Sequence, residues 1–291
     1  MISVQDIAAF KESGWKQDAL KIITHDGTFH ADELFSIALL LKFDKTEQQE
    51  IQIVRTRDVE FLSLYHDFSD VFIIDIGNDY NPELRNFDHH QDDEQFKSKA
   101  SIRLVFEYLM YQGKIEHDTG NHLWENLLLL INRWDLGLEQ EFVNYYHRPL
   151  PSLIASYNRS GSDIKTEHQQ FLKALNFAGE CIENELSSFQ LLNSARRGLL
   201  RSRNINSFTL LFDDENPKYQ VLLKQRRGIR FFIFPHKDNW AVSAVDARKN
   251  PLPKVVDDSE LVFRHKDHFL AVFKTKEAAI RFLEPKFQGK I

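Results

Sequence analysis

The first half of the chain alternates short apolar runs with stretches of helical period. Runs rich in Ile, Leu, Val and Phe predict strands covered on both faces. Apolar residues spaced three and four apart predict helices between them. We expect strands at 20–23, 51–55 and 70–77, and helices at 4–14, from about 31, at about 100–112 and at 120–133. This alternation indicates an α/β fold with a doubly wound parallel sheet.

A long helical pattern follows, and the pattern changes beyond it. Apolar residues recur at helical spacing over 164–200, which predicts one long helix joining two domains. It ends at Ala195-Arg196-Arg197-Gly198, where we expect a hinge. A smaller α/β domain is expected next, with strands at 208–212, 230–235, 240–245, 261–264 and 269–273 and helices at 217–225 and from Thr275. The predicted domains are residues 1–195 and residues 205–291.

Composition narrows the class of protein. Of the 291 residues, 42% are hydrophobic and 27% charged, which is typical of a globular protein and excludes a disordered chain, a collagen-like fibre or a membrane bundle. No stretch has the roughly 20 apolar residues of a membrane span. The start, Met1–Asp6, has no basic flank or apolar core, so we expect no signal peptide. One cysteine, Cys181, excludes an internal disulfide and a cysteine-based zinc site. We expect a cytoplasmic protein.

Charge is divided unevenly along the chain. The net charge is −6, yet the residues from 193 onward carry 20 Lys and Arg against 11 Asp and Glu. Such a division suits a protein that holds cations with one part and an anionic substrate with the other, although surface charge can also fall unevenly without a function. The basic segment around Arg196 and Arg197 fits a phosphate backbone, or else a solvated helix face.

Histidine and aspartate collect in four short segments after predicted elements. The segments are Thr24–Glu33, Ile74–Gly77, Phe87–Gln91 and Asn132–Asp135. In an open parallel sheet the loops after the strands line one crevice, so we expect these side chains to converge. Imidazole and carboxylate donors without thiols suit Mn²⁺, Fe²⁺ or Zn²⁺. Any one of these segments could be a surface turn or a helix cap, and Asp135 is the weakest of the candidate ligands. Four such segments in order along the chain predict a metal site.

Three of the segments resemble the motifs of the DHH phosphoesterase superfamily, above all its melanocyte-proliferating-gene (Myg) branch of metal-dependent hydrolases. The resemblance rests on Thr-His-Asp-Gly-Thr-Phe-His-Ala-Asp-Glu, which holds His25 through Glu33, on Asp75-Ile76-Gly77 and on Asp88-His89-His90-Gln91. The resemblance covers about residues 20–200 and is looser over the rest of the chain. It implies a DHH-type N-terminal sheet bearing two metals, a smaller substrate-binding domain, and the RNA 3′→5′ exonuclease activity known in that branch.

The resemblance also implies a role for each residue of the site. One metal ion would lie on His25, His30 and Asp75, and the second on Asp32, Asp75, His89 and Asp135. His90 would face the scissile phosphate, with Asp88 as its orienting partner. A bridging Asp75 agrees with physical expectation, because two cations about 3.5–4 Å apart need a shared anion. The expected cofactor is two divalent ions, Mn²⁺ first, with Mg²⁺, Fe²⁺ or Zn²⁺ as alternatives.

The C-terminal part departs from the family pattern. The family has a glycine pair in a Gly-Phe-x-Gly-Gly-like stretch, whereas the corresponding segment here, Phe263–Phe273, contains no glycine. Side chains there would hinder the close approach to a phosphate that glycine permits. Arg264 and His265 would replace those contacts as substrate-binding residues, or belong to a solvated β-hairpin. The departure affects the identity of the substrate more than the metal chemistry.

The sequence therefore predicts a metal-dependent phosphohydrolase whose substrate stays open. The leading hypothesis is a two-metal phosphodiesterase or exonuclease that releases nucleotides from single-stranded RNA or DNA. The alternatives are a small-substrate phosphatase or pyrophosphatase, and a catalytically idle metal-holding module that binds nucleic acid or protein. A homodimer is compatible with each. The chain has no motif for dinucleotide binding, P-loop chemistry or serine hydrolysis.

Overall fold

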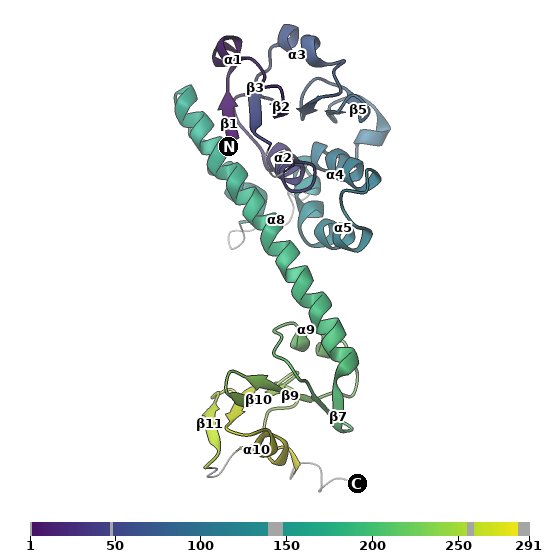
Figure 1. The fold of residues 1–291 in the computed structure, drawn as a ribbon, viewed down its shortest axis with the longest axis vertical. Coiled ribbons are helices and arrows are strands. Elements are labelled where there is room, and N and C mark those ends of the chain that lie inside the picture. The colour runs from purple at the N-terminus through teal and green to yellow at the C-terminus, as the bar shows by residue number, and fades with distance from the viewer. Residues whose placement is uncertain (1, 47–48, 139–147, 255–258, 285–291) are drawn as a thin grey trace. The chain divides into compact units, whose positions relative to one another are not determined.

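The structure is a computed structural model that describes residues 2–46, 49–138, 148–254 and 259–284 (Figure 1). The chain divides into two compact units, Met1–Leu186 and Ser187–Ile291. The division falls within helix α8 (Ile164–Arg201), ahead of the boundary that the sequence suggests. Among the described helices, none combines the length and the apolar character needed to cross a membrane.

The first unit is built on a six-stranded sheet in the order β1-β3-β2-β4-β6-β5. The strands are β1 (Ile2–Gln5), β2 (Leu20–Thr24), β3 (Ile51–Arg55), β4 (Val71–Ile74), β5 (Tyr80–Asn81) and β6 (Asn86–Phe87). All neighbours pair in parallel except β5, which runs antiparallel to β6. The expected parallel α/β sheet is confirmed.

Helices cover both faces of this sheet, because successive strand residues point into two different cores. Phe72 and Ile74 of β4 belong to the larger core, whereas Val71 and Ile73 belong to the smaller one. The smaller core is covered by α1 (Ile7–Ser13) and α3 (Val59–Tyr65). The larger core is covered by α2 (Ala31–Phe43), the 3₁₀ turn η1 (Glu94–Phe96), α4 (Ser101–Tyr111), α5 (His117–Leu123), the π-helical turn η2 (Trp124–Leu128), α6 (Leu129–Asp135), α7 (Leu150–Ala155) and the first part of α8.

The N-terminal segment differs from the helix expected over residues 4–14. Ile2–Gln5 form β1 at the edge of the sheet, with Val4 opposite Ile53 of β3. The helix begins only at Ile7, after Asp6 accepts a hydrogen bond from the Ala9 N–H at 2.8 Å. Pairing with a strand far along the chain outweighs the local helical pattern here, so that prediction is wrong at its first residues.

The second unit has its own six-stranded sheet, in the order β11-β12-β10-β9-β8-β7. Its strands are β7 (Arg203–Asn206), β8 (Thr209–Leu211), β9 (Phe231–His236), β10 (Asn239–Ala244), β11 (Leu261–Arg264) and β12 (Leu270–Phe273). Helix α10 (Lys276–Arg281) packs on one face, and α9 (Tyr219–Lys224) with the end of α8 packs on the other. This is the smaller α/β unit that the sequence predicts.

Helix α8 runs through Gly198 without a break, so the hinge predicted at Arg197-Gly198 is wrong. A Cβ atom at Gly198 would lie 1.9 Å from Tyr219 Oη. Tyr219 is itself fully buried, and its hydroxyl donates a hydrogen bond to Asp214. The glycine at this position therefore allows α9 to pack closely against α8.

Gly198→Ala should destabilise the protein by about 1–3 kcal/mol, because the new methyl group overlaps a buried and hydrogen-bonded tyrosine. Gly179→Ala is the matched control on the same helix, since no described atom beyond its chain neighbours and the backbone of its own helix lies within 4 Å of a Cβ atom there. That control should be more stable than wild type by about 0.5–1 kcal/mol. Urea unfolding followed by circular dichroism measures both changes. Equal stability of the two variants would contradict the packing role of Gly198.

Candidate metal centre

The candidate centre begins where three neighbouring strands end at one edge of the first sheet. The last paired row across β2, β4 and β6 consists of Thr24, Ile74 and Phe87. The residues directly after this row are His25, Asp75 and Asp88. Since the carboxyl ends of parallel strands share one edge, the register of the sheet places these three side chains near one another.

Asp75 is the residue at which two groups of side chains meet. Its carboxylate is buried, with Oδ2 3.5 Å from His25 Nε2 and Oδ1 3.3 Å from His89 Nε2. Ser101 Oγ donates a hydrogen bond to Oδ1 at 3.0 Å. The backbone of Asp75 has a φ of 57°, a left-handed conformation that costs a residue with a side chain roughly 1–3 kcal/mol. The strained turn holds the carboxylate between the two imidazoles.

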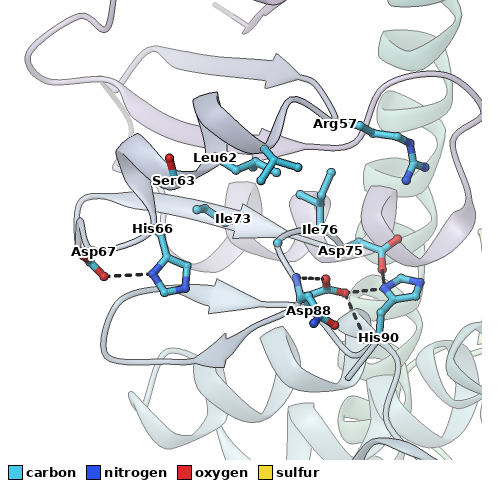
Figure 2. Close-up of a pocket in the computed structure, with 13 residues that line it drawn as sticks. Arg57, Leu62, Ser63, His66, Asp67, Ile73, Asp75, Ile76, Asp88 and His90 are labelled. Carbon is cyan, nitrogen blue, oxygen red and sulfur yellow. Dashed lines mark hydrogen bonds and ion pairs between the residues drawn. The ribbon is translucent and has the colours of Figure 1, made fainter. Parts of the chain in front are cut away.

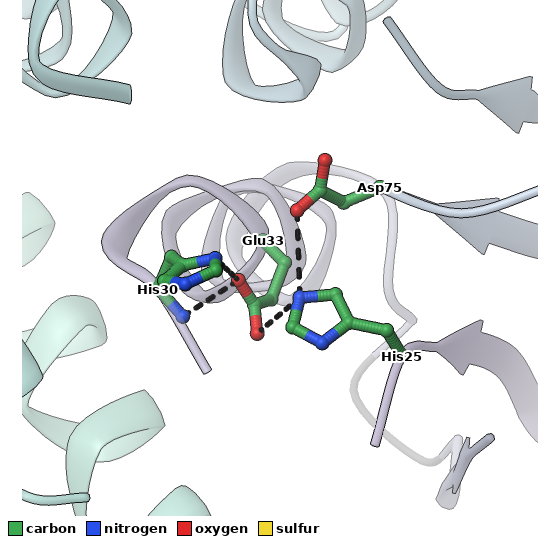
Figure 3. Close-up of side chains that lie close together, drawn as sticks. All are labelled: His25, His30, Glu33 and Asp75. Carbon is green, nitrogen blue, oxygen red and sulfur yellow. Dashed lines mark hydrogen bonds and ion pairs between the residues drawn. The ribbon is translucent and has the colours of Figure 1, made fainter. Parts of the chain in front are cut away.

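The first group of side chains joins the loop after β2 to the start of α2 (Figure 3). It consists of His25, His30, Glu33 and Asp75, whose ligand atoms lie within 4.8 Å of one another. Glu33 Oε1 is 3.1 Å from His25 Nε2, and Oε2 accepts a hydrogen bond from the His30 N–H at 2.8 Å. Sequence reasoning gave Glu33 no role. The signal that could have found it is its spacing from His30, because a glutamate at the third helical position often bonds the backbone of the N-cap.

The second group lies on the His89 side of Asp75. His89 Nε2 is 3.2 Å from Asp135 Oδ2, at the end of α6. Asp32, His89 and Asp135 form one set of ligand atoms within 4.8 Å, and Asp75, His89 and His90 form another. The structure thus brings all six metal ligands implied by the resemblance into adjoining sets, in which Glu33 and His90 also lie.

Asp32 is buried and is stabilised by the amino end of α4. Its Oδ2 accepts a hydrogen bond from the Ser101 N–H at 3.0 Å, and its Oδ1 accepts one from the Ile102 N–H at 2.8 Å. Burial and the charges of Asp135 and Asp75 raise the pKa of Asp32 well above its usual value. The helix amides oppose that shift by favouring the carboxylate, and each oxygen keeps a second lone pair for a ligand.

Asp88 contacts His90 and the neighbouring backbone. Its Oδ1 accepts hydrogen bonds from His90 Nδ1 at 2.6 Å and from the His89 N–H at 2.8 Å. Its Oδ2 accepts one from the Asn78 N–H at 2.6 Å. The bond to Asp88 raises the pKa of His90, and the imidazole is 60% exposed. Asp88 therefore fixes the proton on Nδ1 and leaves Nε2 of His90 available to a ligand.

The donor set fits divalent metal ions. Among the described residues, His25 Nε2, Glu33 Oε1 and His89 Nε2 are buried and, beyond the ion-pair contacts given above, have no hydrogen-bond partner. Such atoms cost about 1–3 kcal/mol each when nothing satisfies them. His25 Nδ1 contacts the Asp26 carbonyl at 3.1 Å, the arrangement that leaves Nε2 of an imidazole free for a metal. Imidazoles and carboxylates without a thiolate suit Mn²⁺, Fe²⁺ or Zn²⁺.

The electrostatics of the centre also favour cations. Burial on its own would lower the pKa of His25, but the charges of Glu33 and Asp75 outweigh it and raise the pKa to about 10. Burial opposes charge on His89 in the same way, and its contacts with Asp135 and Asp75 raise its pKa to about 10. Asp75 is buried, yet these two imidazoles lower its pKa. A proton on each Nε2 thus supplies positive charge where a metal ion would.

Metal binding should therefore release protons. At pH 7 both His25 and His89 are protonated in the metal-free protein, because their pKa of about 10 lies above the pH. Each bound ion must displace the proton from Nε2, so saturation with Mn²⁺ should release about two protons, and the affinity should fall as the pH is lowered. Calorimetric titration in buffers of different ionisation enthalpy counts the protons. A binding enthalpy that does not depend on the buffer would contradict this.

A buried arginine holds the loop that carries His25 and His30. Arg55, the last residue of β3, donates hydrogen bonds from Nη1 to Glu167 Oε1 at 2.5 Å and from Nη2 to the Gly27 carbonyl at 2.8 Å. Glu167 in turn accepts a hydrogen bond from the Gly27 N–H at 3.1 Å. The guanidinium carbon also lies 4.6 Å from the ring centre of Phe171. Strand β3 and helix α8 therefore fix the loop from outside the centre.

The four residues predicted to bind substrate lie in the second unit. Arg196 and Arg197 are exposed on α8, and Arg196 donates a hydrogen bond to Asn193 at 3.0 Å. Arg264 and His265 belong to the hairpin of β11 and β12, at the opposite edge of the sheet from β7. The two pairs thus lie on different elements, and their roles stay predictions.

Comparisons with known proteins agree with the resemblance seen in the sequence. The family described as MYG1_exonuc, uncharacterised protein family UPF0160, matches residues 21–285. A MYG1 protein from Chlamydia muridarum is 27% identical over 279 residues, which cover 88% of this chain and 92% of that protein. A MYG1 exonuclease from Rattus norvegicus is 45% identical over 71 residues, 24% of this chain and 17% of that protein. A solved structure of a pGpG-specific phosphodiesterase, PggH from Vibrio cholerae, matches 94% of this chain and 98% of its own, with 11% identity and a TM-score of 0.32.

Proposed function

Since the chain belongs to the MYG1_exonuc family (UPF0160), we propose that it is a metal-dependent phosphodiesterase that releases nucleotides from an end of single-stranded RNA or DNA. The observation that carries the proposal is the carboxylate of Asp75, with one oxygen toward His25 and the other toward His89. A shared carboxylate offsets the repulsion between two cations, an arrangement used for displacement at phosphorus. Relatives named as exonucleases support the same class of reaction.

We assign each of the two groups of side chains to a different metal ion. His25, His30, Glu33 and Asp75 would hold one divalent ion, and Asp32, Asp75, His89 and Asp135 would hold the other. When bound, such ions stabilise negative charge on the phosphate and lower the pKa of water. We propose Mn²⁺ as the native ion, since it binds both the imidazole and the carboxylate ligands of this centre.

His90 supplies a proton donor next to both groups. Asp88 accepts its Nδ1–H, and this hydrogen bond raises the pKa of His90, which favours the protonated imidazole. The Nε2–H is then free to donate to a phosphate oxygen as negative charge develops there, which stabilises the transition state more than the bound substrate. In this proposal Asp88 acts through His90, by holding its orientation and its proton.

The second unit supports nucleic acid as the substrate. Arg196 and Arg197 present positive charge on the exposed side of α8, which suits phosphate groups. Phe263 and Phe269 of the β11–β12 hairpin are 48% and 36% exposed, and exposed aromatic rings suit unpaired bases. We propose that Arg264 and His265 of this hairpin also contact the nucleic acid.

The same hairpin favours a second candidate, hydrolysis of a small phosphate compound such as pyrophosphate. Arg264 is hydrogen-bonded to His268, and the His265 ring lies 4.1 Å from that of Phe269. These side chains engage one another where the family has glycines. A segment filled in this way would leave less room for a long polymer than for a small anion.

Product analysis tests the proposal and separates the candidates. The purified protein would be incubated with Mn²⁺ and 5′-labelled single-stranded RNA, with parallel reactions on DNA and on pyrophosphate and an EDTA control. A ladder of shortened oligomers with mononucleotide products, absent with EDTA, is the expected result. Intact oligomers with phosphate released from pyrophosphate would favour the second candidate. Tight oligomer binding without any hydrolysis would contradict both and favour an idle binding module.

A further inference from the structure

A second cavity adjoins the candidate centre within the first unit (Figure 2). It has a volume of about 690 Å³, within the roughly 300–1,000 Å³ of small-molecule sites. Asp75, Asp88 and His90 line one part of it, and the other walls come from α3, β4 and the loop after β4. A separate cavity of about 460 Å³, lined by Asp32, His89 and Asp135, shares Asp75 and His90 with it.

The two cavities place the centre between them. The side chains that would bind the metal ions mainly line the smaller cavity. The larger cavity extends from Asp75 and His90 toward α3. A phosphodiester held at Asp75 and His90 would have room on the α3 side for whatever is attached to the phosphate. None of the metal-binding roles proposed above uses that space.

The walls of the larger cavity have the character of a site for a ring system. Leu62 of α3, Ile73 of β4 and Ile76 after β4 form its apolar part, and each is less than 10% exposed. In Figure 2 these side chains lie between Arg57, Asp75 and His90 on one side and His66 with Asp67 on the other. The cavity is thus apolar in the middle and polar at both ends, as the sites of amphipathic ligands are.

The polar ends differ in a way that fits a nucleotide. Arg57 is 60% exposed, and its Nε lies 3.6 Å from Asp26, so its guanidinium can also reach an anionic ligand at the rim. His66 at the far end contacts Asp67 at 3.0 Å and Asp79 at 3.2 Å. Cationic groups beside the centre suit phosphate and ribose oxygens, and a histidine with acidic partners suits the polar edge of a base.

We propose that this cavity is the subsite for the nucleoside of the nucleotide that is released, with the base against the apolar wall to which Leu62, Ile73 and Ile76 contribute. The inference rests on the proposed function and names its substrate class as nucleoside phosphodiesters. A substrate made only of phosphate, such as pyrophosphate, would leave the apolar walls without a contact. The walls offer aliphatic contact surface and few groups for reading base identity, so purines and pyrimidines should both be accepted.

Two esters with the same leaving group test this subsite. Thymidine 5′-(p-nitrophenyl phosphate) carries a nucleoside, and methyl p-nitrophenyl phosphate carries a methyl group instead. With Mn²⁺, wild type should prefer the nucleoside ester by roughly 10- to 100-fold in kcat/KM. Leu62→Trp fills the cavity and should reduce this preference about tenfold or more. Val59→Trp, at a 77% exposed position on the rim, should reduce it less.

Leu64→Trp is the matched control, because Leu64 lies on the same helix, is 64% exposed and does not line the cavity. It should keep the wild-type preference. Equal hydrolysis of the two esters by wild type, or an unchanged preference in both Leu62→Trp and Val59→Trp, would overturn the subsite and leave the phosphodiesterase standing. Hydrolysis of neither ester by wild type would overturn the proposed function, and the subsite with it.

Discussion

Replacing Asp75 with asparagine should lower phosphodiester turnover by roughly 10³-fold or more and abolish the binding of both metal ions. The carboxylate faces His25 with one oxygen and His89 with the other, so its charge contributes to both groups of ligands. Asparagine has the same shape and tolerates the left-handed backbone of this position, with its φ of 57°. The substitution therefore removes the charge and leaves the turn intact. Metal content by mass spectrometry and steady-state kinetics measure the two losses.

Asp70→Asn is the control for this change. Asp70 directly precedes the same strand β4, is 57% exposed and pairs only with Lys21 among the described residues. It should keep wild-type metal content and turnover. An Asp75→Asn protein that holds two ions and keeps its activity would contradict the central position of Asp75.

Replacing Arg55 with methionine should have the largest effect on stability, a loss of about 3 kcal/mol or more. The Arg55 side chain is fully buried and bonds both Glu167 and the Gly27 carbonyl. Its removal leaves a partly buried carboxylate and a carbonyl without their partner. The loop with His25 and His30 would also lose its support, so Mn²⁺ affinity should fall about 10- to 100-fold. Urea unfolding and calorimetric titration check the two effects.

Two further variants distinguish a specific role from a general loss of charge. Arg57→Met removes an arginine that is 60% exposed, so stability should change by less than about 0.5 kcal/mol. Arg55→Met combined with Glu167→Leu should recover part of the lost stability, because neither charge is then left without a partner. Wild-type stability and metal affinity in Arg55→Met alone would refute the supporting role of Arg55.

Much of the fold could be predicted because its signals are local. β3 and β11 were expected at the residues where they occur, since each is a short apolar run bounded by polar residues. The convergence of His25, Asp75 and Asp88 could be predicted for the same reason. Parallel strands end at one edge, and the residue after each strand is visible in the sequence.

The features that sequence reasoning missed depend on contacts distant along the chain. Strand β1 forms because it pairs with β3, and its own residues resemble a helix start. Arg55 and Glu167 are 112 positions apart, so no spacing rule links them. The hinge expected at Gly198 was wrong because a glycine near a helix end can either end the helix or allow another element to pack closely against it. The sequence does not distinguish these two roles, and the position of Tyr219 does. Glu33 could have been found, since its spacing from His30 is a local signal.

Anomalous diffraction at the manganese absorption edge, from crystals grown with Mn²⁺, tests the shared centre most directly. The account predicts two peaks roughly 3.5–4 Å apart, one on each side of Asp75. The ion at one peak should contact His25 and Glu33, and the ion at the other should contact His89 and Asp135, as the two groups of ligand atoms predict. A single peak, or two peaks that do not share Asp75, would contradict it.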